Sequence, residues 1–270
     1  MKMTIAAAFA AMGMAHALAA PQAAAPIGGP QYTANALVNS ADFAAGALSP
    51  NTIVTLFGDN LSFSTAKLLS YEIQNDTLPL ELPLTGVHVY VGGIIANIYY
   101  VSPTQINFLI PVEMPPIATT FQVVRDGYAG PQLPLTLVPV APAMYMLDSE
   151  RVVAQLVDGS IIRTDNPAHP GDIVILYATG LGQTVPPLRN GEIPQSAQPI
   201  VNENQLQVLL DGTAVPAANL LYAGTAPKYC GLYQINLRLP DDVGPDPQIR
   251  IGMGSQMSQK NVRLIVLPAQ

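Results

Sequence analysis

The glycine pairs at 180–182 and 252–254 most invite a chemical interpretation, because glycine-rich turns after strands bind nucleotides in many folds. A dinucleotide-binding loop also needs a third small residue and a helix whose N-terminus meets the pyrophosphate. Val185, followed by two prolines, takes the third position in one case, and Met257 takes it in the other. Neither pattern therefore indicates a nucleotide cofactor.

Histidine and cysteine are sparse in this 270-residue chain. Apart from the first twenty residues, it holds His88, His169 and the single cysteine Cys230, and no Gly-x-Ser-x-Gly sequence. These residues cannot form a usual zinc site or a familiar triad. His169 precedes Pro170 in a turn, so we interpret it as a turn residue. Cys230 is either a reactive or interchain thiol or, as we expect, a small buried apolar side chain.

The densest carboxylate cluster is Asp241, Asp242 and Asp246, in a loop rich in proline and glycine. Calcium needs six to eight oxygen ligands, and the ordered calcium-loop pattern is absent from this sequence. We interpret the cluster as a solvated acidic turn. A glycosidase pair of carboxylates stays open, because it is defined by distance in space.

Aromatic rings for stacking on sugars are few, since the chain has no tryptophan. The tyrosines that could be exposed are Tyr99, Tyr100, Tyr222 and Tyr229, although packing in the core or at an edge is the simpler interpretation. Strand alternation would turn one of Tyr99 and Tyr100 inward. We therefore predict no catalytic, cofactor-binding or metal-binding residues, no cofactor and no enzymatic activity.

Composition narrows the class of protein further. Hydrophobic residues make up 49% and charged residues 11%, and 11 basic against 18 acidic residues give a net charge of −7. Binding to nucleic acid or to anionic lipid needs a basic surface, so both are disfavoured. The 26 prolines are incompatible with a mostly helical protein.

The N-terminus has the pattern of a secretory signal peptide. Lys2 precedes an apolar run at 3–18 that ends in Ala17-Leu18-Ala19, so we predict cleavage after Ala19. An N-terminal membrane helix is the alternative, although alanine is a weak residue for spanning a bilayer. Residues 20–35, rich in Ala, Pro, Gly and Gln, are expected to be a flexible leader. The protein is thus expected to be exported, with no stable membrane insertion after cleavage.

The rest of the chain contains a duplication. Residues 36–61 align without gaps on 156–181 at an offset of 120, and 105–111 align on 234–240 at an offset of 129. The second copy therefore carries nine extra residues (129 − 120). The identities in the first block include Ser40/Ser160, Pro50/Pro170, Ile53/Ile173, Val54/Val174, Leu56/Leu176 and Leu61/Leu181.

Short β-branched runs separated by Gly and Pro turns predict an all-β fold made of two tandem Ig-like β-sandwich domains, at 36–140 and 141–268. The segment 61–75 is expected to carry a short helix at best. Pro139 and Pro142 are expected to stiffen the connector between the two domains, so that the domains are held in a fixed arrangement. The expected strands are 52–57, 86–91, 94–101, 105–110, 119–125 and 132–138, then 152–157, 172–178, 206–210, 219–223, 232–238, 248–252 and 261–267.

The repeated Gln-x-Asn sequence is the most specific polar feature of both copies. Alternation places Ile106 and Phe108 on a buried face and Gln105 and Asn107 on the opposite face, and the same holds for Gln234-Ile235-Asn236. The amides could contact a ligand or the other domain. Alternatively, they satisfy loose backbone groups near a sheet edge or crossing loop, which the duplication favours.

Several segments resemble the Solibacter-type uncharacterized C-terminal domain family. The similar segments are 50–61, 101–108, 166–172, 177–182 and 231–236, and the resemblance extends over about 36–267. It implies tandem Ig-like, TIG-type domains of exported bacterial proteins. It implies no known activity, cofactor or ligand, and no site residues.

Together these observations predict an exported, non-catalytic module for binding, adhesion or scaffolding, located outside the cell, on its surface or in the periplasm. The expected partner is a protein or a glycan, and nucleic acid is not expected. The alternatives are a secreted carbohydrate-active hydrolase and a glycan-binding module.

Overall fold

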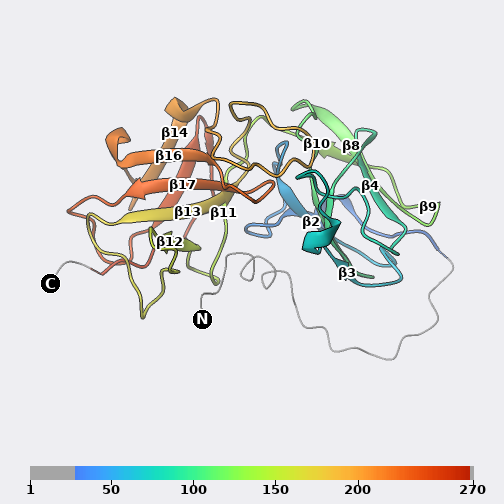
Figure 1. Ribbon diagram of the computed structural model, residues 1–270, viewed down its shortest axis with the longest axis horizontal. Coiled ribbons are helices and arrows are strands. Elements are labelled where there is room, and N and C mark those ends of the chain that lie inside the picture. Colours follow the sequence, from blue (N-terminus) through green and yellow to red (C-terminus); the bar gives the residue numbers. More distant parts are fainter. Residues whose placement is uncertain (1–27, 268–270) are drawn as a thin grey trace.

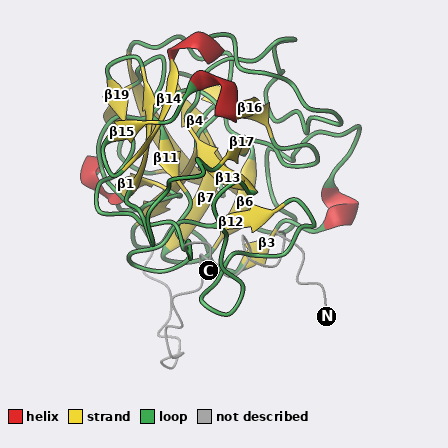
Figure 2. Cartoon of the chain, turned by 90° about the vertical axis from the view of Figure 1, so that its left-hand side faces the viewer, coloured by secondary structure: helices red, strands yellow, loops and turns green. Residues whose placement is uncertain are grey.

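The structure is a computed structural model that describes residues 28–267. The predicted signal peptide at 1–19 lies outside the described residues. The fold is all-β, with two Ig-like β-sandwiches side by side (Figure 1). The helical turns of the described residues are short 3-10 segments at the periphery (Figure 2). Within residues 28–267 no helix is long and apolar enough to cross a bilayer.

The first sandwich contains two sheets whose strand pairs are all antiparallel. The strands are β1 (Leu37–Asn39), β2 (Ile53–Phe57), β3 (Ala66–Lys67), β4 (Val87–Val91), β5 (Ile94–Ile95), β6 (Ile98–Val101), β7 (Gln105–Leu109), β8 (Ala118–Arg125), β9 (Tyr128–Ala129) and β10 (Leu133–Thr136). One sheet has the order β1-β2-β7-β6-β3 and the other β10-β8-β4-β5, with β9 beside β8. Between them lies a core drawn from residues 37–137.

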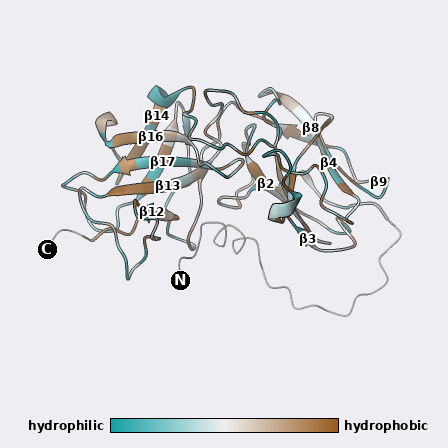
Figure 3. Cartoon of the chain, in the orientation of Figure 1, coloured by the Kyte–Doolittle hydropathy of each residue, from teal (hydrophilic) through white to brown (hydrophobic). Residues whose placement is uncertain are grey.

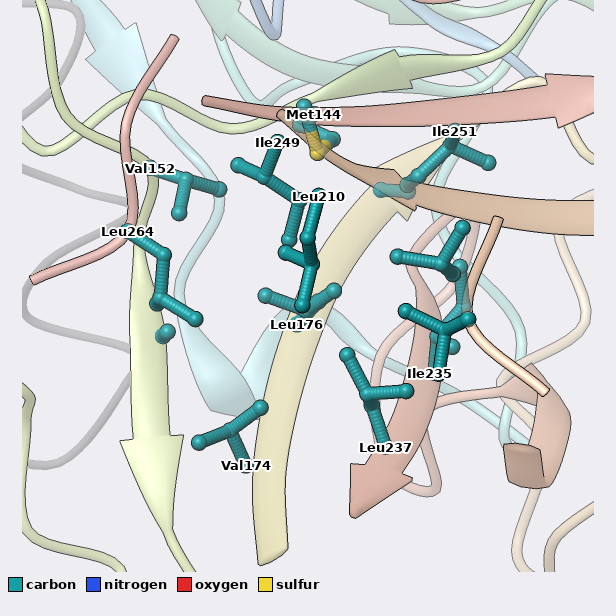
Figure 4. Packing of buried hydrophobic residues seen from close by; sticks show 14 of the residues in the cluster. Met144, Val152, Val174, Leu176, Leu210, Ile235, Leu237, Ile249, Ile251 and Leu264 are labelled. Carbon is teal, nitrogen blue, oxygen red and sulfur yellow. The ribbon is translucent and has the colours of Figure 1, made fainter. Parts of the chain in front are cut away.

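The second sandwich repeats this plan. Its strands are β11 (Ala143–Met144), β12 (Ala154–Leu156), β13 (Ile173–Thr179), β14 (Leu206–Leu210), β15 (Thr213–Ala214), β16 (Leu220–Thr225), β17 (Tyr233–Arg238), β18 (Ile249–Met253) and β19 (Gln256–Met257). One sheet has the order β11-β13-β17-β16, with β12 beside β13, and the other β15-β14-β18-β19. Leu176 of β13 and Ile235 of β17 meet Ile249 and Ile251 of β18 in the core (Figure 4).

Alternation of side chains explains the buried faces. In β4, Val87, Val89 and Val91 are fully buried, and the residues between them are half-buried. Such a period of two forms a strand with one face in a core. Apolar residues accordingly mark the strands and polar residues mark many of the connecting turns (Figure 3).

Two expected strands differ in the structure. Segment 94–101 is split, because the chain leaves one sheet after β5 and joins the other at β6. Segment 261–267 forms only isolated bridges, since its backbone shares hydrogen bonds among three neighbours around residues 150, 168 and 247. In segment 61–75 the structure has the 3-10 turn η2 (Ser70–Glu72), as expected.

The expectation that Tyr99 or Tyr100 points into the core is wrong. The register of β6 against β7 shifts between Ile98 and Tyr100, and Tyr100 lies opposite Asn107 on the outer face. Tyr99 packs with an outer cluster that includes Leu109 and Cys230. A β-bulge inserts an extra residue and so breaks the alternation on which the expectation rested.

The described end of the expected leader, residues 28–35, is packed against the first sandwich. The Tyr32 hydroxyl donates to the Pro131 carbonyl and accepts from the Val123 amide, each at 2.7 Å, and its ring stacks on Phe121. Arg125 donates to the Gly28 carbonyl at 2.8 Å. A flexible leader is therefore wrong for these residues, because buried partners fix a segment whose composition alone suggests mobility.

The sheets locate the extra residues of the second copy. Strands β4 and β14 correspond at an offset of 119 (206 − 87). Tyr100 and Tyr222 correspond at an offset of 122, because each follows a register shift and lies opposite the Asn of its Gln-x-Asn sequence. Three residues are therefore inserted at the 3-10 turn η4 (Ala217–Asn219). Seven further residues (129 − 122) lie between these tyrosines and the Gln-x-Asn sequences, where the loop at 226–232 is four residues longer than its counterpart 102–104. One residue fewer before β14 (120 − 119) leaves the net excess of nine.

This lengthened loop docks the second sandwich onto the outer face of the β2–β7 sheet. Cys230 packs with Leu109, and a Cβ added at Gly231 would lie 2.6 Å from the Leu109 Cδ1. The Tyr99 hydroxyl donates to the Cys230 carbonyl at 2.7 Å. We call this contact region the inter-sandwich seam.

A second connection of the seam lies at 190–193. The Leu78 amide donates to the Gly191 carbonyl at 2.9 Å, and the Ile193 amide donates to the Asp76 carbonyl at 2.7 Å. The expected fixed pair thus has a structural basis, although most of it lies outside the proline-containing connector.

Candidate functional site

The Gly180–Gly182 turn is a packing device at the junction of the two sandwiches. Gly180 has a φ of 76°, and a Cβ there would lie 2.0 Å from the Ala141 carbonyl oxygen. The Gly182 carbonyl accepts a hydrogen bond from the Tyr233 hydroxyl. Glycine is needed here because the backbones approach closely, which is unrelated to phosphate binding.

The two histidines occupy local surface contacts. His88 lies 3.1 Å from the Glu81 carboxylate. His169 is exposed, and the Asp172 carboxylate accepts a hydrogen bond from its backbone amide at 2.8 Å, which closes the turn before β13. No group of three His, Cys, Asp or Glu side chains suited to a metal occurs among residues 28–267.

Cys230 lies buried inside the seam. Burial raises the pKa of its thiol to about 12, so the thiol is protonated at neutral pH. The docked seam also covers it, which leaves it inaccessible to a second chain.

The acidic residues at 241–246 serve their own turn. The Asp246 carboxylate accepts from the Val266 amide at 3.2 Å, and its carbonyl accepts from the Arg263 guanidinium at 2.7 Å. Asp241 and Asp242 are exposed. This arrangement stabilises a loop and does not gather oxygens around one point.

The repeated amides lie on central strands, which corrects the expectation of a sheet edge or crossing loop. The Gln105 amide donates to the Asn107 carbonyl oxygen at 2.8 Å, and Gln234 donates to Asn236 at 3.3 Å. In each copy the two side chains share the outer face of a strand with neighbours on both sides. They therefore satisfy each other within the sheet.

Aromatic rings accompany these amides at matching positions. Phe57 lies opposite Gln105, and Tyr177 lies opposite Gln234. Tyr177 is buried in a cluster with Ala41 of the first sandwich. Phe57 is 41% exposed beside Phe43, but their rings are inclined by 35° and do not form a flat platform.

A groove lined by charged side chains lies on the second sandwich. It has a volume of about 610 Å³, within the range of ligand sites. Two turns that flank β12 in the sequence form it, and β12 is labelled in Figure 1. Its lining residues are Leu147, Asp148, Arg151, Arg163, Thr164, Asp165 and Ile265.

The first turn is held by Asp148. One carboxylate oxygen accepts from the backbone amides of Glu150 and Arg151, each at 2.9 Å. The other oxygen lies 3.8 Å from the Arg151 guanidinium, which also donates to the Thr164 hydroxyl at 3.3 Å. The Arg151 side chain is thus oriented across the groove, while most of its donors remain unused.

The second turn presents Arg163, Thr164 and Asp165 at its tip, all exposed. Arg163 and Asn166 exchange two backbone hydrogen bonds of 3.0 Å, and the Asn166 amide anchors the turn on the Ser160 hydroxyl. Within residues 28–267 no hydrogen bond or ion pair engages the side chains of Arg163 or Asp165. The tip is therefore fixed by its backbone, and its charges face solvent.

The duplication provides an internal control for these charges. At the offset of 120, Arg163, Thr164 and Asp165 correspond to Phe43, Ala44 and Ala45. The first copy forms its sandwich without them, so folding does not require this charged set.

The groove was not predicted from the sequence, although the sequence carries one signal of it. Six of the 18 residues at 148–165 are charged, compared with 29 (11 + 18) of 270 in the chain. This local enrichment marks the two turns, but only the fold brings them together beside Ile265.

No family model and no curated protein matches this chain. Among solved structures, it is similar to a surface glycan-binding protein of Prevotella bryantii, with 12% identity and a TM-score of 0.28 over 86% of this chain and 42% of that one. It is also similar to a Bacteroides ovatus surface glycan-binding protein in complex with a heptasaccharide, with 11% identity and a TM-score of 0.34 over 88% of this chain and 47% of that one. The tandem Ig repeats of Dlar share 11% identity, with a TM-score of 0.20 over 90% of this chain and 97% of that one.

The chain spans less than half the length of both glycan-binding structures. At such TM-scores the superposition of whole chains is poor. The fold assignment therefore depends on the sheets and cores described above.

Proposed function

We propose that this protein is an exported, non-catalytic binding module that works outside the cell, on its surface or in the periplasm. We further propose that its ligand occupies the groove between residues 147–151 and 163–165. We also propose that the chain belongs to the Solibacter-type family that its sequence resembles, because that resemblance implies exported proteins with Ig-like domains.

The groove carries the proposal. It combines a concave shape, an apolar part of the lining formed by Leu147 and Ile265 (here called the floor), and the exposed side chains of Arg163 and Asp165, which have no hydrogen-bond or ion-pair partner among the described residues. A few polar groups over an apolar floor are typical of ligand sites. The docked seam supports the proposal as well, because two sandwiches held together present this groove in a constant orientation.

A hydrolase is the second candidate, because Asp148 and Asp165 both line the groove. A glycosidase uses two carboxylates, one on each side of the scissile bond. Asp148 already accepts two backbone hydrogen bonds that hold its turn, which favours a structural role for this carboxylate. We therefore prefer binding without turnover.

A binding screen tests the proposed function. The full mature chain would be applied to a glycan microarray and to envelope fractions, together with the variant Arg151→Gln/Arg163→Gln. Specific retention that the double variant loses would support the groove. Retention that the variant keeps would contradict it, and release of reducing ends from a retained glycan would favour the hydrolase.

A further inference from the structure

We propose that the groove recognises a carboxylated sugar residue, as in an acidic glycan that contains uronic acids. This inference rests on the proposed function, because it names the chemistry of the ligand that the groove would take.

The arginines define where a carboxylate would bind. Arg163 has an exposed guanidinium without a partner among the described residues, and Arg151 makes only a 3.3 Å hydrogen bond and a 3.8 Å ion pair. A guanidinium presents five donors in a planar fork that matches a carboxylate. The chain has only 11 basic residues, and two of them, Arg151 and Arg163, line this one groove.

The aspartates limit the charge of the ligand. Asp148 and Asp165 stand beside Arg151 and Arg163, so the formal charges of the four side chains sum to zero. A phosphorylated or highly anionic ligand would be repelled by the aspartates. A single carboxylate surrounded by hydroxyl groups would satisfy the arginines and donate to the free oxygens of Asp165.

The floor favours a sugar ring over an acidic peptide. Ile265, which is 8% exposed, and Leu147 are the apolar side chains that line the groove. A pyranose ring presents a C–H face to such a surface and hydroxyls at its rim. An acidic peptide carries its charges on flexible side chains and would pay more conformational entropy for the same contacts.

Isothermal titration calorimetry on the full mature chain tests the inference with a matched pair of probes. The probes are an oligosaccharide that carries a single terminal uronic acid and the same oligosaccharide with that carboxylate methyl-esterified. We expect the free acid to bind at least tenfold more tightly than the ester, and to weaken at high salt because exposed charges are screened.

Variants locate the site. Arg163→Gln should weaken binding of the free acid about tenfold, which is the effect of losing one charge-assisted hydrogen bond. Arg163→Lys should bind with an affinity between those of the wild type and Arg163→Gln, because it keeps the charge but loses the planar fork. Arg189→Gln is the matched control, because Arg189 is also exposed and is not among the residues that line the groove. Unchanged thermal unfolding would show that each variant is folded.

The outcomes separate the two proposals. Equal binding of acid and ester, or preference for an acidic peptide, would overturn the carboxylated sugar and leave the binding module standing. Binding of the free acid that Arg163→Gln and Arg151→Gln both leave unchanged would overturn the location. Failure of every probe, together with a negative glycan and envelope screen, would overturn the proposed function as well.

Discussion

The side-chain amide of Asn51 in the first sandwich donates a 3.0 Å hydrogen bond to the hydroxyl of Tyr233 in the second. The same hydroxyl donates to the Gly182 carbonyl, so one oxygen joins a turn of each sandwich. Tyr233 is fully buried at the start of β17, and Asn51 is buried with a φ of 62°. The contact places a polar link inside the seam, where an unpaired group is costly.

Replacement of Tyr233 by phenylalanine should therefore destabilise the protein. Loss of the hydroxyl leaves the Asn51 amide and the Gly182 carbonyl without this partner, at a cost of about 1–3 kcal/mol. Urea denaturation would measure the free energy of unfolding. Tyr71→Phe is the control, because Tyr71 is exposed and its loss of a hydroxyl should change little.

The loop at 226–232 should be sensitive to a single methyl group. Gly231 has a φ of 68°, and an added Cβ would lie within 2.8 Å of both Leu109 and Ile53. Gly231→Ala should loosen the docking of the sandwiches, seen as a larger radius of gyration in small-angle scattering and faster proteolysis of the seam.

Gly93→Ala is a matched control for Gly231→Ala. Gly93 has a φ of 84°, so alanine adds similar backbone strain, but no atom lies within 4 Å of its added Cβ. It should lose about 1 kcal/mol of stability while the radius of gyration stays constant. If both variants keep the native radius, the seam does not depend on the close approach at Gly231.

The thiol of Cys230 should report on the seam. Burial raises its pKa to about 12, so a disulfide reagent such as DTNB should react very slowly with the native protein at pH 8. Reaction should become rapid in denaturant. Gly231→Ala should show intermediate rates, and rapid labelling of the native wild-type chain would contradict the buried position.

Stability should fall at alkaline pH. Burial raises the pKa of Cys230 from 9.0 and of Tyr233 from 10.0, each to about 12, so the unfolded chain loses these protons first. The contribution of these two groups to stability is then constant below about pH 8.5 and decreases as the pH rises from 9 towards 12, by up to about 1.4 kcal/mol per pH unit for each group. Denaturation midpoints across this range would measure it.

Cys230→Ala separates the contribution of the thiol from that of the buried tyrosines, because burial also raises the pKa of Tyr99, Tyr145 and Tyr177. It removes the group with the lower reference pKa, so the decrease should begin about one pH unit higher than in the wild type. Identical profiles for the variant and the wild type would show that the thiol does not contribute.

The sequence alone determined the class of fold. Alternating apolar residues in segments such as 87–91, together with the repeated Gln-Ile-Asn, predicted strands whose buried faces the structure confirms. These features are local, because a period of two and a glycine turn act within a few residues. The duplication strengthened the prediction, since two copies had to satisfy the same pattern.

Tertiary structure decided the rest. The bulge at Ile98–Tyr100 reversed the expected alternation, and distant partners such as Arg125 fixed residues that composition described as flexible. The extra residues were counted in the sequence, but only the sheets showed that four of them lengthen the loop at 226–232. The groove likewise brings together two turns and Ile265, which are far apart in the sequence. Contacts of this range follow from the packing of a whole sandwich and not from any local pattern.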